Sequence, residues 1–122
     1  MEKLAEMALL ADFYGPLLTE KQQIVLDLHY QQDLSLAEIA ELENISRQAI
    51  HDLLKRTERI LAEYEDKLGL VQRFKAEREK FMKVQALLQS LNEQDYSSRA
   101  GWELHLQIRS MIEDVFVDIS TF

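Results

Sequence analysis

Apolar residues recur every three or four positions along most of the chain, a pattern typical of helices with one buried side. Only three glycines and one proline interrupt the 122 residues, so helix is favoured nearly throughout. The chain is therefore expected to be all-α. The periodicity predicts helices at about residues 2–14, 20–31, 36–43, 47–68, 70–91 and 98–119.

Capping side chains indicate where several of these helices begin and end. Thr19 with Gln22, and Ser35 with Glu38, have the spacing of capping boxes, in which each side chain satisfies a free backbone N–H at a helix start. Gly69 follows the fourth apolar stretch and is expected to cap the end of that helix. The resulting division is a domain of residues 1–69 and a two-helix extension of residues 70–122.

The helices at 36–43 and 47–68 form a predicted helix-turn-helix. Between them, Asn44 tolerates the left-handed backbone of a tight turn, and Ser46 is a suitable N-cap for the second helix. Ala40 is small enough to let the helices cross closely, and Ile45 can fill the corner. The predicted buried positions of the pair are Leu36, Ile39, Ala40, Leu42, Ile50, Leu53, Leu54, Thr57, Ile60, Leu61 and Tyr64.

The second of these helices would be the recognition helix, whose first turns reach base edges in the DNA major groove. Arg suits guanine and Gln suits adenine, while basic residues further along can hold phosphates. Ala49 and Asp52 lie among these positions and make the helix less basic than a typical promoter-reading helix. The candidate nucleic-acid contacts are Arg47, Gln48, His51, Lys55, Arg56 and Arg59.

The last third of the chain has a different pattern. Residues 70–91 carry a heptad seam interrupted only by Glu77, and we interpret a basic run at 73–83 as its solvated flank rather than as an RNA contact. The apolar members of the seam are Leu70, Phe74, Phe81, Val84, Leu88 and Leu91. The final helix, expected to be capped by Asp95 or Ser97, is apolar over an arc too broad for one neighbouring helix to cover, and Trp102 is an expected core or interface anchor. We therefore expect this helix pair to dock on the first domain, to pair with a second chain as a homodimer, or both.

The net charge of −8 is unusual for a protein that binds a polyanion. Residues 1–46 carry two lysines against nine acidic residues, a net charge of −7, while residues 47–69 carry five of each sign. A nucleic-acid surface would therefore rely on local basic clusters in a repelling field. Binding is expected to be weak and sensitive to salt.

Several kinds of chemistry have no support in the sequence. The chain has no cysteine, and His29, His51 and His105 are too far apart in the chain to suggest a metal site. His51 is expected on a helix surface, and the other two histidines in partly buried or surface positions. Ser35 and Ser46 are interpreted as caps rather than nucleophiles, so we expect no catalytic residue, cofactor or metal. No apolar run approaches the roughly 20 residues of a membrane span, and the acidic N-terminus lacks the basic-then-apolar order of a secretion signal, so we expect a cytoplasmic protein.

Two family resemblances rest on the motifs above. Residues 18–61, with LTEKQQIVLDLHY at 18–30 and SLAEIAELENISRQAI at 35–50, resemble the fourth, promoter-recognising region of bacterial sigma factors. Including LADFYGPLLTEKQ at 10–22, the chain more closely resembles the YlxM-like family of small bacterial helix-turn-helix proteins. That resemblance implies an all-helical cytoplasmic protein of sigma-like topology, with a part in the signal recognition particle pathway and no catalytic residue or cofactor.

Two functions remain open at this point. The first is a non-enzymatic DNA-binding regulatory protein that uses the recognition helix. The alternative is an adaptor that binds the signal recognition particle, its GTPase or its RNA, through the acidic N-terminal surface or the apolar C-terminal helices. The sequence does not name a DNA site or decide between DNA and RNA.

Overall fold

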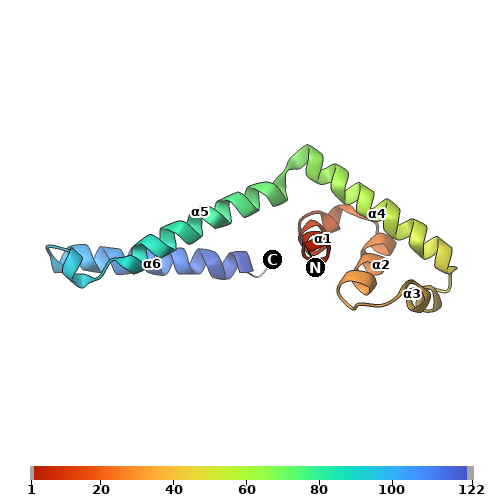
Figure 1. The fold of residues 1–122 in the computed structure, drawn as a ribbon, viewed down its shortest axis with the longest axis horizontal. Coiled ribbons are helices and arrows are strands. Elements are labelled where there is room, and N and C mark those ends of the chain that lie inside the picture. Colours follow the sequence, from red (N-terminus) through yellow and green to blue (C-terminus); the bar gives the residue numbers. More distant parts are fainter. Residues whose placement is uncertain (1, 121–122) are drawn as a thin grey trace. The chain divides into compact units, whose positions relative to one another are not determined.

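The computed structural model describes residues 2–120, and side chains for residues 3–115. These residues are helical with no strand, which confirms the predicted all-α fold class (Figure 1). The chain folds into two compact units, the first ending at Val71 and the second beginning at Gln72. The helices are α1 (Glu2–Tyr14), η1 (Gly15–Leu17), α2 (Glu20–Tyr30), α3 (Leu36–Glu43), α4 (Arg47–Leu68), α5 (Leu70–Ser90), η2 (Glu93–Asp95) and α6 (Arg99–Ser120).

In the first unit, α1, α2 and α3 all pack against α4 (Figure 1). The long helix α4 buries one side along most of its length, and its buried Thr57 hydroxyl donates a hydrogen bond to the Leu53 carbonyl at 2.8 Å. That bond removes the cost of placing a hydroxyl in an apolar core. The buried apolar residues are Leu10, Tyr14, Leu18, Val25, Leu26, Ile39, Ala40, Ile50, Leu54, Leu61 and Val71.

A hydrogen-bond network fixes the point where α4 gives way to α5. The buried Tyr14 hydroxyl donates to Glu65 Oε1 at 2.6 Å and accepts from the Leu70 N–H at 3.1 Å. Val71 N–H also donates to Glu65 Oε1, at 3.0 Å. Gly69, between the helices, has a φ of 63°, in the left-handed region that favours glycine. The network therefore satisfies the first free N–H groups of α5 with side chains from α1 and α4.

Some predictions about buried positions were wrong. Leu42 was expected on the buried side of α3, yet its side chain is 62% exposed, because only one stripe of this short helix faces α2 and α4. Helical spacing predicts Ile24, Val25, Leu28 and Tyr30 on the inner side of α2, but Ile24 is 41% exposed and Leu26 is buried in its place. In both cases helical spacing defined an apolar side that was wider than the contact made by the neighbouring helices.

The second unit contains α5, η2 and α6, with an aromatic cluster near the start of α6. The Trp102 and His105 rings stack at a centroid distance of 4.7 Å, and the Tyr96 hydroxyl lies 2.9 Å from His105 Nδ1. His105 was expected to be partly buried or on the surface, but it is fully buried because these two rings cover it. The start of α6 also differs from expectation, since Ser98 Oγ, rather than Asp95 or Ser97, accepts from the Gly101 N–H.

The apolar residues of the second unit are only partly covered. Phe74, Phe81 and Leu88 of the predicted seam are half-buried, whereas its other apolar members remain exposed. Among the side chains that the structure describes, none of the apolar ones beyond Val71 is fully buried. The exposed large apolar residues of this unit are Met82, Val84, Leu87, Leu91, Leu104, Leu106, Ile108 and Met111.

Candidate nucleic-acid interface

Local capping interactions build the turn between α3 and α4. Ser35 and Glu38 form the predicted capping box at the start of α3. The Ser35 N–H donates to the Glu38 carboxylate, and this hydrogen bond holds the pKa of that carboxyl below its usual range. Asn44 adopts the left-handed conformation, with φ 56° and ψ 42°, and its N–H donates to the Ala40 carbonyl. Ser46 Oγ then accepts from the Ala49 N–H at 3.0 Å and starts α4. These contacts fix the direction in which α4 leaves the turn.

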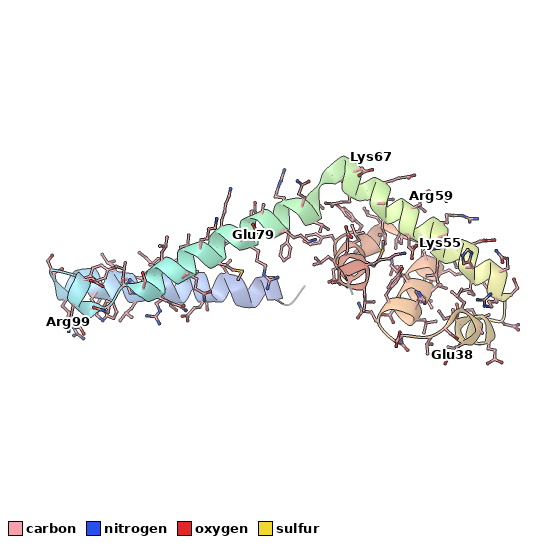
Figure 2. The ribbon with its side chains drawn as sticks, viewed as in Figure 1. Glu38, Lys55, Arg59, Lys67, Glu79 and Arg99 are labelled. Carbon is pink, nitrogen blue, oxygen red and sulfur yellow. The ribbon has the colours of Figure 1, made fainter. Side chains whose placement is uncertain are left out.

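The structure leaves all six predicted contact residues exposed on α4. Helical spacing places positions 48, 52, 55 and 59 on the side of α4 opposite the buried one, with 51 and 56 on its two flanks and 47, in the first turn, nearest the buried side. Figure 2 shows Lys55, Arg59 and Lys67 following one another along α4. We call the side chains of Arg47, Gln48, His51, Asp52, Lys55, Arg56 and Arg59 the recognition surface.

Asp52 occupies the middle of the recognition surface and engages two of the predicted contacts. The Gln48 amide Nε2 donates to Asp52 Oδ1 at 3.0 Å, and His51 Nδ1 lies 3.5 Å from the same oxygen. Gln48 must therefore release or share this bond before it can contact a base. The spacing of four residues between Gln48 and Asp52 is the sequence signal for this pair.

Lys55 is also paired, and its partner Glu58 and the neighbouring Tyr30 were not predicted as part of the site. Its Nζ lies 3.6 Å from Glu58 Oε2, and the Tyr30 hydroxyl of α2 donates to the other Glu58 oxygen. Burial and the neighbouring Glu58 carboxylate raise the pKa of Tyr30. The Glu58 side chain is only 13% exposed, so it stays beside Lys55 and offsets part of its charge. The spacing of three residues between Lys55 and Glu58 predicts their ion pair. No such local spacing connects Tyr30 with Glu58, because the two lie 28 positions apart in the sequence.

Three arginines remain as the available cations of the recognition surface. Arg47, Arg56 and Arg59 form no ion pair with any residue that the structure describes. The first turn of α4 also contains no acidic residue, so the positive end of the helix dipole beside Arg47 is not neutralised there. This end of α4 is therefore the most favourable place on the helix for a phosphate or a base edge.

Metal binding and membrane insertion can be judged for the part of the chain that the structure describes. Within it, no group of three or more His, Cys, Asp or Glu side chains is arranged to hold a metal ion. Within the same residues, no helix is both long enough and apolar enough to cross a membrane.

The α3–α4 geometry, with its left-handed turn and exposed second helix, defines the protein as one of the helix-turn-helix class. Residues 1–100 match the UPF0122 family, described as "Putative helix-turn-helix protein, YlxM / p13 like". The chain belongs to this family.

Curated relatives extend the match over most of the chain. It is 40% identical over 115 residues to a UPF0122 protein of Clostridium novyi, covering 94% of this chain and 93% of the relative. It is 51% identical over 88 residues to a UPF0122 protein of Desulforamulus reducens, covering 72% and 75%. A UPF0122 protein of Bacillus mycoides is 50% identical over 88 residues, covering 72% and 80%.

Proposed function

We propose that the protein is a DNA-binding regulatory protein that inserts the start of α4 into the major groove. The observation that carries this proposal is the exposure of all six predicted contacts on α4, the helix that packs against α1, α2 and α3. Membership of a helix-turn-helix family supports the same function.

The available groups suggest a division of roles along the helix. Arg47 and Gln48, in the first turn of α4, have the donors that suit guanine and adenine edges. Arg56 and Arg59 lie two to three turns further on and suit backbone phosphates, which position a helix without reading sequence. Because few cations are available on a chain of net charge −8, we expect modest affinity and a steep loss of binding with salt.

The test is binding of a fluorescent DNA duplex pool at low salt, measured by anisotropy, for the variant Arg47→Ala plus Arg56→Ala. We expect the Kd to rise about tenfold or more, since each lost contact to a base or phosphate weakens binding. The control is Lys3→Ala plus Lys21→Ala, which removes the same charge from the first two helices. Unchanged binding by the α4 variant, or an equal loss in the control, would contradict the proposal.

A second candidate function is that of an adaptor in the signal recognition particle pathway, acting as a cytoplasmic homodimer. The acidic first 46 residues and the exposed apolar side chains of α5 and α6 favour it, because both suit protein partners better than a polyanion. The resemblance to YlxM-like proteins supports the assignment to this pathway. A pulldown from lysate, with and without nuclease, separates the candidates: particle components retained after nuclease treatment would support the adaptor, and their absence would count against it.

A further inference from the structure

A groove of about 500 Å³ lies between α1 and α2 in the first unit. Its apolar lining includes Ala8, Ala11 and Leu28, together with Ile24, which is exposed despite its size. Such a surface favours an apolar side chain from another molecule, because covering it removes hydrocarbon from water.

The edge of this groove is acidic. Asp12 and Asp27 both line it and are exposed, and none of its lining residues is Lys or Arg. Asp27 accepts a hydrogen bond from Gln32 Nε2 at 2.9 Å, and neither aspartate has an ion pair with a residue that the structure describes. With −7 on residues 1–46, the groove therefore suits a positively charged segment with an apolar side.

The chain itself contains a segment of this chemistry in α5. Five basic residues lie within residues 73–83 against two acidic ones, and all five are exposed. Lys75, Arg78 and Met82 are spaced by three and four residues, so they share one side of the helix, and Met82 is exposed. None of the basic residues is paired with a carboxylate in the described part of the chain: they are Arg73, Lys75, Arg78, Lys80 and Lys83.

We propose that α5 of one copy binds the α1–α2 groove of a second copy, with Lys75 and Arg78 facing Asp12 and Asp27 and Met82 contacting the apolar lining. This inference rests on the proposed homodimer and assigns its contact surface. A dimer in which each α5 occupies the groove of the other copy has two identical contacts related by a two-fold axis. The opposed charges make the dimer weaken with salt, whereas a dimer held only by apolar side chains would be insensitive.

The experiment uses full-length chains carrying charge reversals on one side of the contact. One variant is Asp12→Lys plus Asp27→Lys, and the other is Lys75→Glu plus Arg78→Glu. We expect sedimentation equilibrium to show a dimer for the unchanged protein and a dissociation constant about tenfold or more higher for each variant alone, because like charges then face each other. Circular dichroism verifies that both variants remain helical.

Mixing the two variants provides the decisive measurement. In a mixed dimer the reversed groove meets the reversed helix, and the two unchanged surfaces also meet, so both contacts regain opposite charges. We expect mixing to restore the dimer. The matched control is Glu6→Lys plus Glu41→Lys, which reverses two exposed charges outside the groove and should leave the dissociation constant within about twofold.

Three results would overturn the proposal, and they separate its failure from that of the functions above. A dimer unaffected by either variant would leave the homodimer standing but assign it to another surface. A chain that is monomeric at tens of micromolar would remove both the homodimer and the groove contact, and failure of the mixture to dimerise would remove the pairing. DNA binding, measured on the same samples, depends on α4 and is judged separately.

Discussion

At the scale of single residues, Asp52 is the side chain that would most directly oppose the proposed nucleic-acid binding by the recognition surface. It accepts a hydrogen bond from Gln48 and lies beside His51, so it places a negative charge among the groups that would approach DNA. Asp52→Asn removes that charge, while the amide oxygen can still accept the bond from Gln48. We expect DNA affinity at low salt to rise about threefold to tenfold, as measured by anisotropy.

The comparison for this prediction is Glu63→Gln, which removes an equal charge from the same helix about three turns further on, outside the recognition surface. Because net charge changes equally, a general electrostatic effect would raise affinity to the same extent in both variants. A larger gain for Asp52→Asn would locate the effect in the recognition surface, and equal gains would contradict that assignment.

Tyr14 carries a larger share of stability than its single hydroxyl suggests. The hydroxyl donates to Glu65 and accepts from the Leu70 N–H. Tyr14→Phe therefore removes one hydrogen-bond partner from each of these groups, in a partly buried place. We expect the free energy of unfolding to fall by about 1–3 kcal/mol in urea titrations. The matched control is Tyr64→Phe, since Tyr64 stacks on Tyr14 and its hydroxyl has no hydrogen bond to a residue that the structure describes. Equal losses in the two variants would contradict the role of the network.

The same tyrosine gives stability a dependence on pH. Burial, followed by the hydrogen bond to Glu65, raises the pKa of Tyr14 above its usual value of about 10. The folded state therefore holds the phenol proton more tightly than the unfolded chain does. This contribution is complete below pH of about 10 and is lost as pH rises through the higher folded pKa. Tyr14→Phe should accordingly show a smaller loss of stability in alkali than the unchanged protein.

At the scale of elements, Asn44 lowers the conformational free energy needed to form the turn of the helix-turn-helix. Its φ of 56° costs little for Asn or Gly but about 1–2 kcal/mol for most other residues, because Cβ then approaches the following carbonyl. We expect Asn44→Ala to lower the free energy of unfolding by about 1 kcal/mol in urea titrations, and Asn44→Gly to change it by less than half as much. Equal effects of the two substitutions would show that the Asn side chain, rather than the backbone angle, matters.

The elements that the sequence predicted well are those defined by local signals. The structure confirms the capping boxes at Thr19 and Ser35, the left-handed Asn44 and the N-cap Ser46. Each could be predicted because it involves residues within four positions of one another. Side-chain burial was predicted less well, as Leu42 shows, since burial depends on where neighbouring helices lie. The Tyr14–Glu65 bond joins residues 51 positions apart and left no local signal in the sequence.

The candidate site shows the same division between local and distant information. The solvent side of α4 followed from helical spacing, so the exposure of Arg47, Gln48 and His51 was predictable, while their role in binding stays a prediction. The ion pair between Lys55 and Glu58 could be predicted from their spacing alone. The hydrogen bond from Tyr30 to Glu58 could not, because Tyr30 belongs to another helix. Helical spacing therefore predicts which side chains face solvent. It does not predict which of these side chains are already paired with a neighbour.

At the scale of the whole molecule, the two units differ in how much apolar surface they bury. All the buried apolar residues lie at or before Val71, whereas in the second unit His105 is the buried side chain among those described. A unit with so small a core is expected to be marginal alone and to gain stability when its exposed apolar residues are covered. Trp102, the single tryptophan, lies in this unit beside His105 and reports on it.

We therefore expect unfolding in urea to occur in two steps at low protein concentration. Trp102 fluorescence should change at a lower urea concentration than most of the helical circular dichroism signal, which violates two-state behaviour. If a second copy binds α5, raising the protein concentration about 100-fold should shift the fluorescence midpoint upward, because the dimer must dissociate for the second unit to unfold. The later transition should stay nearly unchanged, because α5 is by then unfolded and no longer occupies the groove of the other copy. Charge reversal at Lys75 and Arg78 should abolish that shift. Coincident transitions at every concentration would instead mean that the units unfold as one.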